Sequence, residues 1–219
     1  MSLSDDVSGF LLSSDTGIQY GLSRLRFSVD GLGVDPEGYA EIGRQIRQRA
    51  ITVREPRSRP GTPIAAAYTA GTDTLSVRLP AGLVLTDFTP RAVGEQAGLV
   101  HEITHALFDF HGYRTTNAVE EAVAYIAETL YATSRMLRRS SPGEPRVEAI
   151  LSAALGVVTG RQMLVRTGQA LSSSAADVRA LVDAVRAHSA AYPDADAANH
   201  TDGIFGGLMN PWYPSARFG

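Results

Sequence analysis

The stretch that most constrains this chain is His101-Glu102-Ile103-Thr104-His105, an H-E-x-x-H motif. It lies in a segment, residues 93–110, whose apolar residues recur every three or four positions, which is typical of an amphipathic helix. Residues four apart share one face of a helix, so the two imidazoles can hold one zinc ion. Glu102, beside the first histidine, can take a proton from a zinc-activated water. The motif therefore predicts a zinc-dependent hydrolase with Glu102 as general base.

The composition limits the other ligands and the partners. The chain of 219 residues contains five histidines and no cysteine, so histidine and carboxylate side chains must supply any metal site. A hydrophobic content of 44% and a charged content of 20% are those of a globular domain. The net charge of −3 provides no basic face, so we expect no nucleic-acid partner.

The ends and the apolar windows of the chain bear on its location. Residues 1–10 lack the positive start and long apolar core of a signal peptide. The most apolar window, residues 149–159, is shorter than the roughly 20 residues that span a bilayer. We therefore expect no transmembrane segment and no membrane partner, in a protein that is cytoplasmic or exported without a visible signal peptide.

Strand-like and helical patterns are segregated along the chain, which favours an α+β fold. Alternating or β-branched runs lie in the N-terminal half, and the clearest is a hairpin of residues 63–70 and 74–79 around Gly71-Thr72-Asp73. Helical spacing predicts helices at 36–49, 90–111, 117–138, 146–166 and 174–191. We expect one domain, 1–219, with a polar arm (1–20), a lobe containing a mostly antiparallel sheet and the motif helix (21–115), and a helical lobe (116–219).

A hydrolytic zinc site takes three protein ligands and leaves one position for water. Besides the two motif histidines, the residues that can complete it are Glu120, Glu121 and His111. His111 has the offset found in the H-E-x-x-H-x-x-G-x-x-H pattern of metzincins, but Phe108 stands where that pattern needs a turn glycine. In a helix that runs straight on, His111 lies about 15 Å from His101 along the axis. Helical periodicity does not separate Glu120 from Glu121.

The run His101-Glu-Ile-Thr-His-Ala-Leu-Phe-Asp-Phe110 resembles the active-site helix of gluzincins, the group of zinc peptidases that includes thermolysin. In that group a glutamate on the following helix is the third ligand. Glu121-Ala-Val-Ala-Tyr125-Ile-Ala127 is similar to the E-A-x-x-[FY]-x-A run of several small bacterial members. This resemblance, over residues 98–130, implies a zincin-like fold, Zn²⁺ ligands His101, His105 and Glu121, and a metallopeptidase that acts on a peptide or protein.

Two positions depart from the thermolysin pattern, which has Asn directly before the ligand glutamate and Asp four residues after it. Here these positions hold Glu120 and Tyr125. Other side chains must therefore orient the histidines, and we expect Asp109 or Asn117 to do so.

The resemblance also implies a tyrosine or histidine that stabilises the oxyanion. The sequence offers Tyr113, Tyr131, Tyr192, His200 and Tyr213. The strand at 74–79, just before the motif helix, is expected to form the edge of the cleft and to pair with an extended substrate.

Two other interpretations stay open. One is a metzincin-like zinc peptidase with His111 as the third ligand. The other is a zincin-shaped binding or regulatory module that cleaves nothing. Glu102 favours an enzyme, because a purely structural metal site has no need of that carboxylate.

Overall fold

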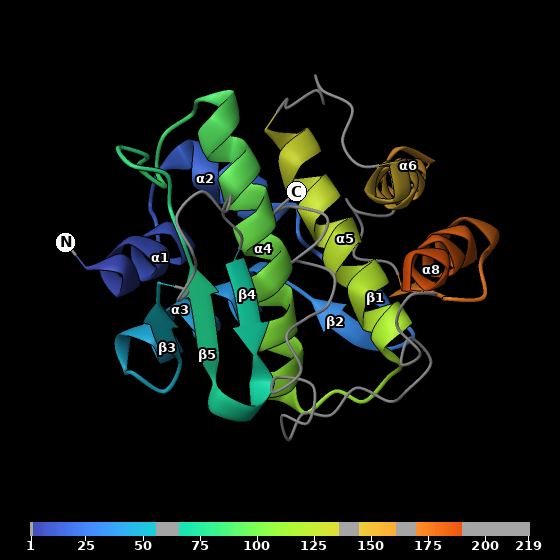
Figure 1. Ribbon diagram of the computed structural model, residues 1–219, viewed down its shortest axis with the longest axis horizontal. Helices are drawn as coiled ribbons and strands as arrows, with labels where there is room; N and C mark the ends of the chain where they lie inside the picture. The colour runs from blue at the N-terminus through green and yellow to red at the C-terminus, as the bar shows by residue number, and fades with distance from the viewer. Residues whose placement is uncertain (1, 56–65, 136–144, 161–169, 190–219) are drawn as a thin grey trace.

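The computed structural model describes residues 2–55, 66–135, 145–160 and 170–189. Within these residues the architecture is a mixture of helices and small sheets, consistent with the predicted α+β class. Helix α4 (Pro90–His111), which carries the motif, occupies the middle of the molecule (Figure 1). It packs against helix α5 (Asn117–Ser134), which carries Glu121, and against strand β4 (Ala66–Thr69).

The first residues fold as two helices, so the predicted polar arm is wrong. Helix α1 (Leu3–Leu11) begins with a capping box between Ser2 and Asp5, and Asp15 caps α2 (Thr16–Ser23). Phe10 and Leu11 are buried in the core. The polar composition of this stretch reflects caps and solvent-facing positions, whereas a few apolar residues at helical spacing are enough to dock it.

In the described part of the chain the strands form two sheets, each of three strands. In the first, β1 (Phe27–Val29) pairs antiparallel with β2 (Leu32–Val34) and parallel with β6 (Ala170–Leu171). In the second, β5 (Thr74–Val77) lies between β3 (Thr52–Arg54) and β4, with the order β3-β5-β4. The pairing of β4 with β5 is antiparallel and confirms the predicted hairpin within the described residues, which begin at Ala66.

Two expectations about these sheets are wrong. Each sheet contains one parallel pairing, of β1 with β6 or of β3 with β5, so neither is mostly antiparallel. The parallel partners lie far apart in the sequence, where local patterns carry no information. In addition, β5 is the central strand of its sheet, so β4 rather than β5 forms the edge beside α4.

Helix α3 (Pro36–Arg47) fixes α4 from a further side. Gly38 lies so close to α4 that an added Cβ would come within 2.7 Å of the Leu107 side chain. One turn of α4 earlier, the buried hydroxyl of Thr104 lies 2.7 Å from that of Tyr39. Close backbone approach and a buried hydrogen bond therefore hold α3 against the helix of the motif.

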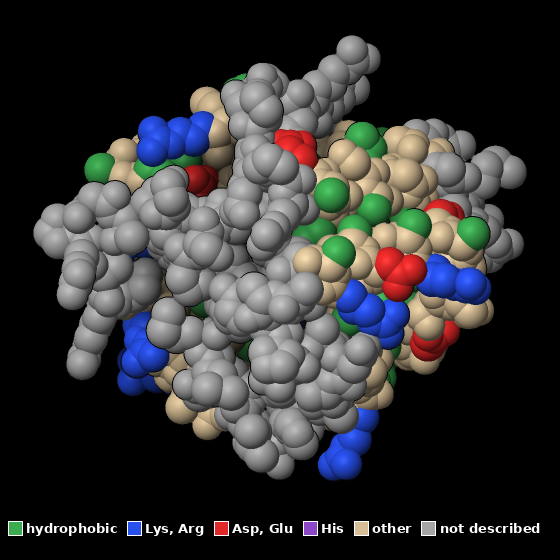
Figure 2. Space-filling model, turned by 45° about the vertical axis from the view of Figure 1, so that its right-hand side comes forward, with side chains coloured by type: hydrophobic (Ala, Val, Ile, Leu, Met, Phe, Trp, Pro, Cys, Tyr) green, Lys and Arg blue, Asp and Glu red, His purple; other side chains and the backbone are tan. Residues whose placement is uncertain are grey.

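The helices after the motif pack around α5. Helix α4 ends at Gly112, whose φ of 63° is the left-handed conformation that glycine adopts at low cost. Thr116 then caps α5, and α6 (Pro145–Gly160) and α8 (Ala176–Ser189) contact its other side. Among the described helices, none has the length and apolar character needed to cross a bilayer. The described part of the face in Figure 2 carries acidic and basic side chains interspersed.

Candidate metal centre

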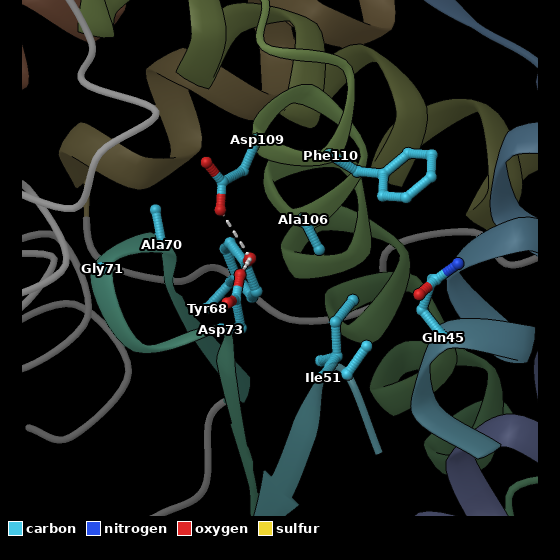
Figure 3. A pocket seen from close by; sticks show the side chains of 10 residues that line it. Gln45, Ile51, Tyr68, Ala70, Gly71, Asp73, Ala106, Asp109 and Phe110 are labelled. Carbon is cyan, nitrogen blue, oxygen red and sulfur yellow. Dashed lines mark hydrogen bonds between the residues drawn. The ribbon is translucent and has the colours of Figure 1, made fainter. Parts of the chain in front are cut away.

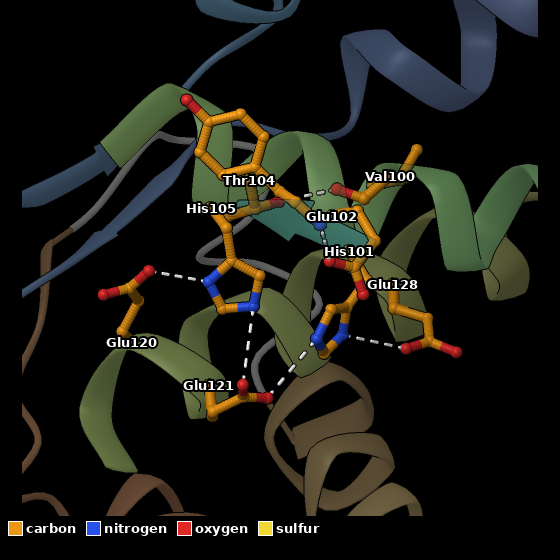
Figure 4. A network of polar contacts seen from close by, with 9 residues as sticks. Val100, His101, Glu102, Thr104, His105, Glu120, Glu121 and Glu128 are labelled. Atoms are coloured by element: carbon orange, nitrogen blue, oxygen red, sulfur yellow. Dashed lines mark hydrogen bonds and ion pairs between the residues drawn. The ribbon is translucent and has the colours of Figure 1, made fainter. Parts of the chain in front are cut away.

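Three potential metal ligands converge between α4 and α5 (Figure 4). Helix α4 presents His101 and His105 one turn apart, and the first turns of α5 present Glu121. Ligand atoms from the three residues all lie within 4.8 Å of one another. The structure thus brings together the three residues that the resemblance implies, as a group that could hold a metal ion.

Each histidine Nε2 lies at a separation typical of tetrahedral ligands from one carboxylate oxygen of Glu121. Nε2 of His101 lies 3.4 Å from Oε2 of Glu121, and Nε2 of His105 lies 3.6 Å from Oε1. Zinc with ligand bonds of about 2.0–2.2 Å places tetrahedral ligand atoms about 3.3–3.6 Å apart. The buried Nε2 of His105 has no hydrogen-bond partner among the described residues, which is what a ligand atom requires.

Carboxylates hold the other nitrogen of each ring. Nδ1 of His101 lies 3.0 Å from Oε2 of Glu128, and Nδ1 of His105 lies 2.6 Å from Oε1 of Glu120. An ionised carboxylate can only accept, so each Nδ1–H donates and each Nε2 points toward Glu121. Metal-binding histidines are commonly oriented by such contacts, which fix the tautomer and raise the basicity of the ligand nitrogen.

The cluster attracts positive charge. Burial lowers the pKa of His101, but the contacts with Glu121 and Glu128 and the charges of Glu121 and Glu102 outweigh burial and raise it to about 10. The pKa of His105 is also raised, because the charge of Glu121 and the hydrogen bond with Glu120 exceed the effect of its burial. A proton and a metal ion compete for the same Nε2 lone pair, so a site that favours protonation also suits a divalent cation.

Glu102 is buried and tied to strand β4. Its Oε2 accepts a hydrogen bond of 2.9 Å from the backbone N–H of Tyr68. The phenol of the same tyrosine donates to Oδ2 of Asp109 over 2.7 Å. Tyr68 therefore contacts α4 at two points and fixes the direction of the Glu102 carboxylate.

Two residues that the sequence suggested for the site, His111 and Asp109, have other contacts in the structure. Helix α4 continues through the buried Phe108, and His111 is its last residue, with its ring edge-on to Phe110 and tilted against Tyr113. His111 is not part of the group with metal-ligand spacing. Asp109, one of the two residues expected to orient a histidine, accepts a hydrogen bond from the Tyr68 hydroxyl, and the two Nδ1 atoms lie against Glu128 and Glu120 instead.

The residues predicted to stabilise an oxyanion have different surroundings in the structure. Tyr131 is buried and donates to Oε1 of Gln96 within the core. Tyr113 packs against Phe108 and His111 at the end of α4. Tyr192, His200 and Tyr213 lie outside the described residues.

Sequence reasoning missed the contact of Glu128 with His101 and the orienting contact of Glu120 with His105. Glu128 follows Glu121 by seven residues, so the two share a face of α5 two turns apart. That spacing was available in the sequence. Glu120 was considered only as a ligand, whereas it holds the ring of His105 from the side away from Glu121.

Neither the family models, nor the curated proteins, nor the solved structures with which the chain was compared give a match.

Proposed function

We propose that this protein is a zinc-dependent metallopeptidase of the gluzincin-like, zincin-fold type. The observation that carries the proposal is the convergence of His101, His105 and Glu121 while a carboxylate holds Nδ1 of each histidine. A ligand set of two imidazoles and one carboxylate is that of catalytic zinc sites, which keep a fourth position for water or substrate.

Charge balance supports a divalent cation there. Four carboxyl groups, those of Glu102, Glu120, Glu121 and Glu128, surround two imidazoles. Buried charges are costly unless they are paired. A divalent cation between the Nε2 atoms and Glu121 would offset part of this excess negative charge.

The residues around the site would have separate roles in the reaction. Bound zinc would lower the pKa of a coordinated water and polarise the carbonyl of a peptide bond. Glu102 would accept a proton from the attacking water and return it to the leaving amine. The Tyr68 amide holds the Glu102 carboxylate in one orientation, and Glu120 and Glu128 hold the two rings, so the acceptor and the ligands are positioned before substrate arrives.

A non-catalytic zinc-binding module is the second candidate, since the three ligands alone do not require hydrolysis. The buried and oriented Glu102 favours the enzyme, because this carboxylate is not among the ligand group.

The test compares the zinc-loaded wild type with Glu102→Gln on an unbiased peptide library. Glutamine can still accept the Tyr68 N–H, so we expect both proteins to fold and to bind about one zinc per chain. Cleavage by the variant should fall by about 10²–10⁴-fold, as for loss of a general base. Equal cleavage by both proteins would refute the mechanism, and zinc binding without cleavage by either would favour the module.

A further inference from the structure

A cavity of about 470 Å³ lies beside the C-terminal half of α4 (Figure 3). This volume falls within the range of about 300–1,000 Å³ typical of ligand pockets. The residues that line it come from α3, the loop before β3, the β4–β5 hairpin and α4: Gln45, Ala50, Ile51, Tyr68, Ala70, Gly71, Asp73, Ala106, Asp109 and Phe110.

The cavity lies one turn further on along the face of α4 that also carries the candidate catalytic base. Glu102, Ala106 and Asp109 are spaced i, i+4 and i+7, so they follow one face of α4. Tyr68 spans that face, with its amide on Glu102 and its hydroxyl on Asp109. A side chain bound against Ala106 would therefore lie about one helical turn along α4 from Glu102.

The polar wall of the cavity is anionic. The Tyr68 hydroxyl lies 2.7 Å from Oδ2 of Asp109 and 3.2 Å from Oδ1 of Asp73. A phenol has one proton and donates it to one carboxylate at a time. Burial first, and then the hydrogen bond to Asp109, raise the pKa of Tyr68, so the phenol stays neutral. None of the described lining residues is basic.

The remaining walls suit an aliphatic stem. Ile51 and Ala106 are buried apolar residues, and the ring of Phe110 is 48% exposed. Long basic side chains lay their methylenes on apolar surface and carry the charge beyond it. A planar guanidinium can also contact two carboxylates at once and stack on an aromatic ring, which an ammonium does less well.

We propose that this cavity binds an arginine side chain of the peptide substrate and so directs cleavage to sites near arginine. This inference rests on the proposed peptidase function for its biological meaning. The binding preference itself stands on the cavity alone.

The test uses full-length, zinc-loaded Glu102→Gln protein, which should bind peptides without cleaving them. The probes are capped tripeptides of alanine with arginine, lysine or norleucine in the middle, titrated by NMR. We expect the arginine peptide to bind about tenfold more tightly than the norleucine peptide. Asp109→Asn and Asp73→Asn should each reduce that ratio, whereas Asp183→Asn, an exposed carboxyl on α8, should leave it unchanged.

Each outcome is decisive. Equal affinity for arginine and norleucine, or a ratio that Asp109→Asn leaves intact, would overturn the proposal even if the protein is a peptidase. Lysine bound as tightly as arginine would overturn the guanidinium assignment. Conversely, if Glu102→Gln cleaves as fast as wild type, the peptidase mechanism fails, but an arginine preference measured with the metal-free protein would still support the cavity.

Discussion

Glu120 and Glu121 contact opposite nitrogens of the same imidazole. Oε1 of Glu120 lies 2.6 Å from Nδ1 of His105, and Oε1 of Glu121 lies 3.6 Å from its Nε2. Neighbouring residues on a helix point about 100° apart, which lets the two adjacent side chains reach around one ring. Glu121 is thus the one that could contribute a ligand to a metal ion, and Glu120 is the one that orients the ring of His105.

This division predicts different effects on zinc binding. Glu121→Gln removes a charged ligand, so we expect the variant to lose stoichiometric zinc at micromolar metal. Glu120→Gln keeps an oxygen that can accept from Nδ1, so its affinity should fall only about tenfold, within the range seen for outer contacts. Chelator-competition titrations measure both affinities. Loss of zinc from Glu120→Gln with retention by Glu121→Gln would reverse the assignment.

Glu128 should affect the zinc affinity although it lies two turns from Glu121, the proposed ligand. Its carboxylate holds Nδ1 of His101 at 3.0 Å in a buried setting. We expect Glu128→Gln to weaken zinc binding by about 10–100-fold. The matched control is Glu37→Gln, which alters an exposed pair with Arg26 and should not change zinc affinity. If the two variants bind zinc equally, Glu128 is only a packing residue.

Two phenylalanines near the end of α4 provide a test of how the helix ends. Phe108 is fully buried, so Phe108→Ala should lower the free energy of unfolding by about 3–5 kcal/mol through the lost burial and the cavity. Phe110 is 48% exposed, and Phe110→Ala should cost much less. Urea denaturation measures both. Similar losses in the free energy of unfolding for the two variants would contradict a helix that runs through Phe108. Loss of zinc binding in His111→Ala would contradict it as well.

Tyr39 should make stability depend on alkaline pH. Thr104 Oγ1 donates to the Val100 carbonyl, so the Tyr39 hydroxyl donates to Oγ1, and Tyr39→Phe should cost about 1 kcal/mol near neutral pH. Burial raises the pKa of Tyr39 in the folded chain above its ordinary value. The resulting stability is complete below about pH 10 and decreases as the pH rises further, because the unfolded tyrosine ionises first.

Urea denaturation between about pH 8 and 11 checks this dependence. The wild type should lose stability over the range, and Tyr39→Phe should lose less. Parallel slopes for wild type and Tyr39→Phe would show that the hydroxyl does not remain buried.

Local patterns predicted the parts of this fold that depend on local interactions. Thr89 and Gly112 bound α4, and Asp73 in a left-handed conformation closes the β4–β5 hairpin, because caps and turns are set by neighbours in sequence. The H-E-x-x-H spacing likewise fixes the relation between His101 and His105. The parallel pairing of β6 with β1 joins segments about 140 residues apart, so no pattern of neighbouring residues predicts it.

The contacts that orient His101, His105 and Glu102 depend on tertiary packing. Glu120 and Glu121 are equivalent by periodicity, and only the rotation of α5 against α4 decides which reaches Nε2. The Tyr68 amide could not be predicted as the partner of Glu102, because every residue except proline has the same backbone N–H donor. Asp109 looked suitable from its helical position but faces the hairpin rather than a ring.

The bond from the Tyr68 amide to Glu102 also affects how molecules of this protein meet one another. Strand β4 lies at one side of its described sheet, where an outward amide could pair with a strand from a second molecule. Glu102 of the same chain occupies that donor. The carboxylate proposed as the general base therefore also occupies one backbone donor at this side of the sheet, and a variant without an acceptor at position 102 would leave that amide open to a strand from a neighbouring molecule.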